Sequence, residues 1–237
     1  VAQLAGYVSE HSGYHHGEMS LNKAIVGMAQ EYVGSNNINL LIPNGQFGTR
    51  LEGGKDSASE RYIYTLLNNI AYDIFPESDM GVLNYLNDDG YMVEPDYYAP
   101  IIPMILVNGG KGIGTGFSYE GLFYNVKSII AYIKHRLFEK KYPKVNIEPY
   151  YEGFKGDIIK IEEQKYLFKG KYKQNSYDTI TITELPVGIW TSNYKEFLET
   201  LMETKDKKGR KKKAIIKNYT DNCTDTEIDF KIKFNTG

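Results

Sequence analysis

The sequence has a single cysteine, Cys223, among its 237 residues. One thiol excludes a disulfide framework and any zinc site built from several cysteines. No stretch approaches the roughly 18 consecutive apolar residues that cross a membrane, so we expect no membrane partner. The chain does not open with a basic stretch followed by an apolar one and a cleavage site. We therefore expect no secretion signal and an intracellular protein.

An excess of charge of either sign is also lacking, since 28 Lys and Arg stand against 30 Asp and Glu. The net charge of −2 argues against a strongly basic nucleic-acid binder. One window departs from this balance, because seven of the nine residues in 205–213 are basic. A solvated loop is the favoured interpretation of that window, and a phosphate contact is the alternative. The chain is rich in tyrosine, with 21 residues, and we attribute most of them to a low-GC coding bias.

Hydrophobic periodicity predicts both helices and strands, which indicates an α+β fold. Helix spacing is found around residues 1–8, 18–32, 123–140 and 193–202. The first two segments flank a turn that contains glycine and histidine, an arrangement typical of a helix-turn-helix. Short strands are predicted at Asp157–Ile161, Lys165–Lys169, Thr179–Thr183, Ala214–Lys217 and Ile228–Phe234. Period and composition change together near Gly121, where we place a domain boundary.

A glycine cluster at residues 109–116 lies within an irregular stretch, 95–116. The cluster matches neither the Walker A loop nor the Gly-x-Gly-x-x-Gly fingerprint, which argues against a nucleotide site. Ile113 stands in its middle. From the residues alone, a tight turn with Ile113 buried is the favoured interpretation. The alternative is a wedge that unstacks DNA bases.

His11, His15, His16 and Glu18 lie close together in sequence and raise the question of a metal site. Gly13 interrupts the helix that would align the first two histidines, and no cysteine is nearby. We therefore predict no metal site in this segment. Polar loop residues are the favoured interpretation, and contacts to phosphate or hydroxyl groups come next.

The turn-rich loop before Tyr62 is the most unusual stretch of the sequence. It places a set of cationic and hydroxyl side chains near this tyrosine: Arg50, Lys55, Ser57, Ser59 and Arg61. Tyrosine can act as a covalent nucleophile, and attack on a phosphodiester needs cations for the phosphoryl oxygens. Arginine suits this task because its planar group donates two parallel hydrogen bonds. Composition alone would favour a half-buried loop tyrosine.

Five motifs occur in a fixed order along the first half of the chain. They are Tyr14-His15-His16-Gly17-Glu18, Gly45-Gln46-Phe47-Gly48-Thr49-Arg50, Gly54-Lys55-Asp56-Ser57-Ala58-Ser59 with Arg61-Tyr62, Ile101-Ile102-Pro103-Met104 and Gly112-Ile113-Gly114-Thr115-Gly116. Together they resemble the breakage–reunion region of eukaryotic-type type IIA DNA topoisomerases, including those of large DNA viruses. The resemblance is dense over residues 1–118. It continues more thinly through residues 154–156, 184–186 and 219–221.

The resemblance implies a winged-helix DNA-cleavage domain over residues 1–120, truncated at its start, and a tower domain over 121–237, truncated before a coiled coil. Tyr62 matches the catalytic tyrosine, which would form a 5′-phosphotyrosyl link and leave a free 3′-hydroxyl. Arg61 matches the arginine that supports the scissile phosphate, and His16 matches the histidine that lines the same site. Ile113 matches the isoleucine that bends the DNA, which reverses the interpretation above. Further DNA contacts are implied for His15, Gln46, Arg50, Lys55, Ser57, Ser59 and Lys111.

The resemblance also implies that the cofactors bind elsewhere. Magnesium would sit on a TOPRIM domain with an Asp-x-Asp motif, which this chain lacks, and ATP on a separate ATPase domain. We expect no cofactor within residues 1–237, and we expect this segment alone to cleave DNA poorly. The implied partners are double-stranded DNA, a second copy in a homodimer, and those two domains of the same protein. The implied location is the nucleus, or a viral factory or virion.

Two other functions remain open from the sequence. The first is a non-catalytic DNA-binding or dimerisation module of the same fold, in which Tyr62 is a relic. The joint presence of Tyr62, Arg61, His16 and Ile113 argues against it, because binding alone does not require a nucleophile beside a cation. The second is a nucleotide-binding enzyme that uses the glycine cluster, and the absence of both phosphate-loop motifs argues against that.

Overall fold

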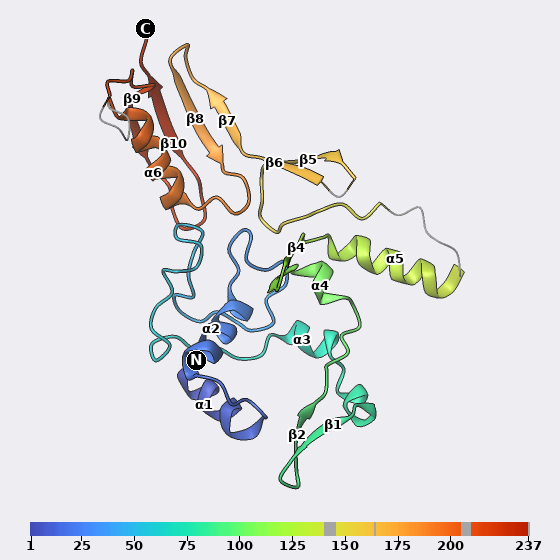
Figure 1. The fold of residues 1–237 in the computed structure, drawn as a ribbon. Coiled ribbons are helices and arrows are strands. Elements are labelled where there is room, and N and C mark those ends of the chain that lie inside the picture. The colour runs from blue at the N-terminus through green and yellow to red at the C-terminus, as the bar shows by residue number, and fades with distance from the viewer. Residues whose placement is uncertain (140–145, 164, 205–209, 237) are drawn as a thin grey trace. The chain divides into compact units, whose positions relative to one another are not determined.

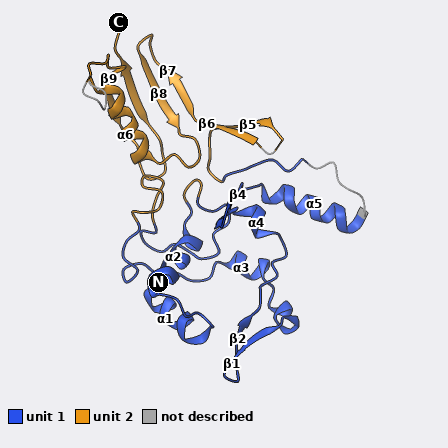
Figure 2. Cartoon of the chain, viewed as in Figure 1, with its two compact units in different colours: residues 1–31, 35–47, 57–151 blue, residues 32–34, 48–56, 152–237 orange. Residues whose placement is uncertain are grey.

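The computed structural model describes residues 1–139, 146–163, 165–204 and 210–236 of the chain (Figure 1). The chain forms two compact units, which Figure 2 colours separately. Unit 1 comprises residues 1–31, 35–47 and 57–151, and unit 2 comprises residues 32–34, 48–56 and 152–237. Unit 2 thus includes two short segments from the first quarter of the chain. The assignment of residues 1–120 to a winged-helix domain and of 121–237 to a tower domain stays a prediction.

Unit 1 is built from short helices and two β-hairpins. Its helices are α1 (Ala2–His11), α2 (Glu18–Ala29), α3 (Asn69–Ile74), the 3₁₀ helix η1 (Glu77–Val82), α4 (Met104–Val107) and α5 (Val126–Glu139). Its antiparallel hairpins are β1–β2 (Tyr85–Asp88 and Tyr91–Pro95) and β3–β4 (Gly110–Gly114 and Phe117–Gly121). The predicted helices at the start of the chain, near Glu18 and in 123–140 are confirmed as α1, α2 and α5.

Two hydrophobic clusters hold unit 1 together. One is formed by the apolar faces of α1 and α2 with Leu41, Phe47 and Ile63, and the other packs around Ile129 of α5. The predicted continuation of the second helix to Tyr32 is wrong, because α2 ends at Ala29. The next residue has extended backbone, and its side-chain amide donates to the carbonyl of Phe47 at 2.8 Å. This contact ties the end of α2 to the loop that leads toward Tyr62.

Unit 2 contains a four-stranded antiparallel sheet in the order β7-β8-β10-β9 and a separate hairpin, β5–β6. The strands are β5 (Asp157–Glu162), β6 (Lys165–Lys169), β7 (Lys171–Gln174), β8 (Thr179–Glu184), β9 (Ile216–Asp221) and β10 (Phe230–Phe234), and the helix is α6 (Thr191–Met202). A core around Phe230, Leu198 and Ile216 joins α6 to this sheet. The strands predicted at 157–161, 165–169 and 179–183 and the last helix are present. The strand predicted at 214–217 is displaced, since β9 covers 216–221, and β10 begins two residues after the predicted start at 228. Strand β7 is an addition.

The two units together confirm the α+β class, since every paired strand of the described chain is antiparallel and the helices are separate from the sheets. Among the described residues, no helix is long and apolar enough to span a bilayer.

Candidate functional site

Tyr62 closes a turn, in which its N–H donates to the carbonyl of Ser59 at 2.9 Å, and the next residue anchors the chain to unit 1. Ile63 is 1% exposed within the cluster formed with α1 and α2, whereas Tyr62 is 66% exposed. The buried side chain of Ile63 fixes the backbone on which the exposed phenol of Tyr62 stands. Two backbone hydrogen bonds between Asn44 and Tyr64, at 2.9 and 3.0 Å, hold the segment against its neighbour. The structure thus presents this phenol on a fixed support.

Arg61 places its cation beside that phenol. Its guanidinium carbon lies 5.0 Å from the centre of the Tyr62 ring, within the range of a cation–π contact. Among the residues that the structure describes, no carboxylate lies within ion-pair distance of Arg61, and its side chain is exposed. The guanidinium therefore retains its donors for a ligand oxygen next to the phenol.

The histidine loop between α1 and α2 rests on the same cluster. Tyr14 packs against the core that holds Ile63, and its hydroxyl donates to the carbonyl of Gly17 at 3.2 Å. The rings of His15 and His16 lie 4.5 Å apart, and both side chains are exposed. The two histidines and Tyr62 are therefore attached to one core, although they are more than forty residues apart in sequence.

The loop that carries the predicted DNA contacts begins at a glycine with no room for a side chain. A Cβ on Gly45 would lie 3.0 Å from Cγ2 of Ile63, and its φ is +114°. The carbonyl of Gln46 accepts the N–H of Ala58 at 2.9 Å, which closes the loop beneath its exposed side chain. Ser59 is exposed as well, and Ser57 is half-buried. Lys55, which belongs to unit 2, is also exposed.

Arg50 differs from its predicted role as a DNA contact. The residue is 5% exposed, and its Nη2 donates to Oε1 of Glu184 at 2.7 Å within unit 2. The same carboxylate accepts the N–H groups of Leu185 at 2.9 Å and Lys155 at 3.0 Å. A guanidinium that is 6% exposed and paired with a buried carboxylate is poorly placed to contact a phosphate. The structure therefore gives Arg50 a stabilising role.

The glycine cluster forms the β3–β4 hairpin, in which Ile113 pairs with Ser118. Ile113 is 86% exposed, so the interpretation of a buried side chain is wrong. Lys111 lies on the same strand, and its ammonium is 3.6 Å from the carboxylate of Glu120. An exposed aliphatic side chain on a two-stranded ribbon is the geometry that a wedge requires.

Other nucleophiles and metal ligands are less suited to chemistry. Burial raises the pKa of the Cys223 thiol to about 12, so the reactive thiolate is scarce at neutral pH. Burial also raises the pKa of the Tyr32, Tyr151 and Tyr194 phenols. The described residues contain no group of three or more His, Cys, Asp or Glu side chains that could hold a metal ion. His11 instead bonds the carbonyl of Tyr7 at 2.9 Å within its own helix.

Comparisons with known proteins agree on one family. A family model for the A-subunit of DNA gyrase/topoisomerase IV matches residues 1–237. DNA topoisomerase 2 top-2 of Caenorhabditis elegans is 48% identical over 238 residues, which cover 100% of this chain and 15% of the relative. DNA topoisomerase 2 of Acanthamoeba polyphaga mimivirus is 53% identical over 202 residues, which cover 85% of this chain and 16% of the relative.

Solved structures give the same result. The crystal structure of the DNA-binding, cleavage and re-ligation domain of Plasmodium falciparum topoisomerase II superposes with a TM-score of 0.92 at 49% identity. The match covers 99% of this chain and 31% of that one. The chain thus spans about 15% of the length of the curated relatives it matches.

Proposed function

The chain belongs to the DNA gyrase/topoisomerase IV A-subunit family, and from this membership we propose that it is the DNA-gate part of a type II DNA topoisomerase. The observation that carries the proposal is the exposed phenol of Tyr62 with the Arg61 guanidinium 5.0 Å from its ring. The phenol is available to a backbone phosphate, and the adjacent cation suits the charge that attack would place on the phosphoryl oxygens.

The proposed reaction is a reversible transfer of a phosphodiester. The phenol of Tyr62 gives up its proton and its oxygen bonds to phosphorus. The bond from phosphorus to the 3′ oxygen breaks, and that oxygen takes up one proton, so no proton is gained or lost overall. The products are a 5′-phosphotyrosyl link and a free 3′-hydroxyl. The reverse attack by that hydroxyl reseals the strand without an external energy source. In this proposal Arg61 donates to the phosphoryl oxygens and His16 and His15 line the site. The neighbouring Tyr14 packs against the same core as Ile63, which supports this placement of the histidines.

The residues of this chain do not fit the magnesium ion that the family implies. The described part has no cluster of three metal-ligating side chains, and the sequence has no Asp-x-Asp motif. We therefore assign magnesium and ATP to TOPRIM and ATPase domains elsewhere in the complete protein. We also propose that the complete protein works as a homodimer on double-stranded DNA, in the nucleus or in a viral factory.

The proposed function is tested by detecting the covalent complex, or adduct, between the protein and DNA. The complete protein is incubated with duplex DNA that is labelled at one end, and the reaction is stopped with a strong denaturant. We expect protein covalently attached to the 5′ end at each break and a 3′-hydroxyl that a polymerase extends. Breaks with protein on the 3′ end would contradict the proposal.

The segment alone should cleave DNA at least about a hundredfold less than the complete protein, because the metal that would share the charge stabilisation is absent. The measurement compares residues 1–237 with the complete protein in the same adduct assay. Efficient ATP-dependent strand passage by residues 1–237 would contradict this prediction.

Replacing Ile113 with alanine tests the wedge. The variant should lose DNA bending and cleavage while its affinity changes less than about threefold, because phosphate contacts supply most of the affinity. Fluorescence energy transfer between the ends of a short duplex measures the bend. Val126→Ala serves as a matched control, since Val126 packs inside unit 1. Equal bend angles for the Ile113→Ala and wild-type proteins would exclude the wedge role.

A further inference from the structure

Residues 48–56, which we call the arm, belong to unit 2, whereas the residues on either side of them belong to unit 1. On one side is Phe47, which is 3% exposed in the cluster that also holds Ile63. On the other side the chain continues through Ala58, which packs against that cluster, to Tyr62. A displacement of the arm is therefore passed to Tyr62 through a short stretch of chain.

The arm is closed on itself by hydrogen bonds. The N–H of Thr49 donates to Oδ1 of Asp56 at 2.9 Å, and its hydroxyl donates to Oδ2 at 2.6 Å. The N–H of Gly54 donates to the carbonyl of Thr49 at 2.9 Å. A Cβ on Gly48 would lie 2.6 Å from the backbone of Gly54, so the two sides of the arm touch. Because the arm is braced internally, we expect it to move as one piece.

The tip of the arm rests on the indole of Trp190. Gly53 has a φ of +62°, and a Cβ built on it would lie 2.4 Å from Cε2 and Nε1 of this ring. Only glycine allows so close an approach in this conformation. The ring of Tyr32 meets the same indole edge-on, with the ring centres 5.7 Å apart. Trp190 thus contacts both short segments that unit 2 takes from the first quarter of the chain.

The arm also caps helix α6, which begins immediately after Trp190. The first N–H groups of a helix have no partner within the helix, and no side chain in the described part of the chain caps α6. The carbonyl of Arg50 accepts the N–H of Thr191 at 3.3 Å, and the carbonyl of Leu51 accepts the N–H of Ser192 at 3.0 Å. The backbone of the arm therefore takes the place of a capping side chain.

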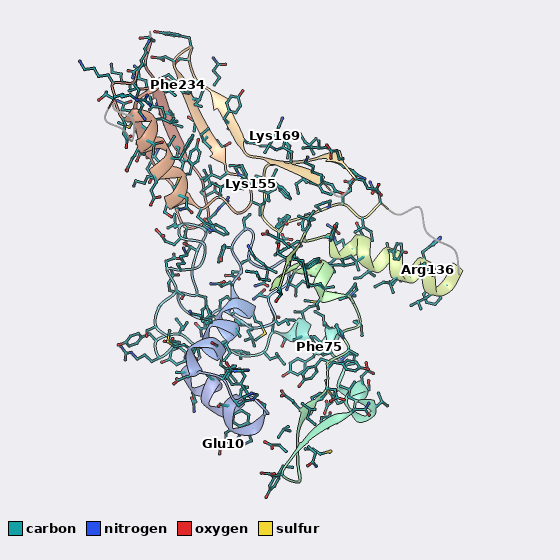
Figure 3. All side chains as sticks on the ribbon, viewed as in Figure 1. Glu10, Phe75, Arg136, Lys155, Lys169 and Phe234 are labelled. Atoms are coloured by element: carbon teal, nitrogen blue, oxygen red, sulfur yellow. The ribbon has the colours of Figure 1, made fainter. Side chains whose placement is uncertain are left out.

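Side chains add to this attachment. The buried Arg50 guanidinium donates to Oε1 of Glu184 at 2.7 Å. Lys155, which Figure 3 labels, donates its N–H to the other oxygen of that carboxylate at 3.0 Å. The hydroxyl of Ser192 donates to the carboxylate of Glu52 at 3.3 Å. Backbone, ion-pair and ring contacts thus hold the arm at one place within unit 2.

We propose that Trp190 is a positioning residue for the reaction of Tyr62 and that it acts through the arm. The indole seats Gly53, the braced arm holds its own base, and the base leads into the turn that Tyr62 closes. A displacement of about 1 Å in the reacting atoms can cost about a hundredfold in rate. The inference rests on the proposed function and identifies the part of unit 2 that this function requires.

The variant Gly53→Ala tests the proposal in the complete protein, because its added methyl group would overlap the indole and displace the arm. Single-turnover adduct formation at saturating DNA gives an observed rate and a final fraction of adduct. Cleavage and religation share one transition state, so a misplaced phenol slows both and changes their equilibrium little. We expect the rate to fall about 10- to 100-fold while the final fraction stays within about twofold. Loss of stability alone would instead lower the fraction and leave the rate unchanged.

The matched control is Gly90→Ala in the turn between β1 and β2. Gly90 has a φ of +93°, so alanine there meets similar backbone strain, but no atom lies within 4 Å of the added methyl group. This control should keep the wild-type rate. Trp190→Phe retains a flat ring and should keep most of the rate, whereas Trp190→Leu should lower it as Gly53→Ala does. Wild-type rates for Gly53→Ala and Trp190→Leu would overturn the proposal. Circular dichroism checks folding, and either variant gives the test if the other is unfolded.

Hydrogen exchange separates this inference from the proposed function. The carbonyls of the arm protect the N–H groups of Thr191 and Ser192, so displacement of the arm should speed their exchange. Faster exchange together with a slower adduct rate in Gly53→Ala supports the positioning role. Faster exchange with an unchanged adduct rate would overturn that role and leave the proposed function intact. Absence of adducts from the wild-type protein would contradict the proposed function and, with it, the positioning role.

Discussion

Replacing Tyr62 with phenylalanine should abolish the covalent adduct in the complete protein. The substitution removes one exposed oxygen and leaves the ring, so Ile63 and the cluster beneath it are undisturbed. Loss of a covalent nucleophile lowers reaction rates by roughly 10⁴-fold or more. Affinity for duplex DNA should change by less than about threefold, since an exposed substitution of this size rarely costs more than about 0.5 kcal/mol. Denaturing gels measure the adduct, and anisotropy measures binding.

Tyr64 provides a matched control two residues away, where the chain has left the turn and pairs with Asn44. Its side chain is 67% exposed, as much as that of Tyr62 at 66%. Tyr64→Phe should therefore retain the adducts that Tyr62→Phe loses. Adducts that persist in the Tyr62→Phe protein would show that another residue is the nucleophile. A wild-type protein that binds DNA but forms no adduct would favour the non-catalytic module.

Segments with regular periodicity could be predicted from the sequence. The stripe of Ile129, Ile130 and Ile133 predicted α5, because every third or fourth residue of a helix faces the same side. Leu137 continues this stripe by its spacing and lies within α5, but its side chain is exposed and is not part of the core. Periodicity identifies the face of a helix that could be buried. It does not determine how far the neighbouring elements extend to cover that face.

The β3–β4 hairpin could not be predicted, because glycine alternates with other residues in the strand that carries Ile113. Glycine has weak strand preference and adds no apolar alternation to detect. The pairing of Gly110 with Gly121 and of Ile113 with Ser118 creates the hairpin only once both segments are in register. The exposure of Ile113 follows from that pairing and was accessible beforehand only through the family resemblance.

The residues of the candidate site also differ in whether local sequence could predict their surroundings. Local sequence places Arg61 beside Tyr62, and the structure adds that Ile63 is the buried residue that fixes the backbone on which the phenol stands. Arg50 was predicted as a cation of this site from its position in the same loop. Its partner, Glu184, is 134 residues away, and no local pattern reveals such a pair. Long-range pairing decides which cations of a loop face solvent.

A substitution that breaks the buried Arg50–Glu184 ion pair should lower the unfolding free energy of unit 2 more than any other single substitution proposed above. Arg50→Met keeps the length of the side chain but leaves the buried Glu184 carboxylate without its cation. Removal of one partner from a buried pair typically costs about 3 to 5 kcal/mol of unfolding free energy. Urea unfolding of the chain, followed by the fluorescence of its single tryptophan, Trp190 in unit 2, measures the loss. Arg61→Met, the same change at an exposed site, should cost less than about 0.5 kcal/mol.

A double-mutant cycle separates the pair from the rest of the carboxylate's contacts. Glu184→Gln keeps one accepting oxygen, so it can serve only one of the N–H groups of Leu185, which bonds Oε1, and Lys155, which bonds Oε2. It also leaves Arg50 buried without a counter-charge. The double variant Arg50→Met/Glu184→Gln buries neither charge. Its cost should therefore be smaller than the sum of the two single costs by about 1 to 3 kcal/mol. Additive costs, or an Arg50→Met protein as stable as Arg61→Met, would show that the pair does not hold unit 2 together and would restore Arg50 as a candidate for DNA contact.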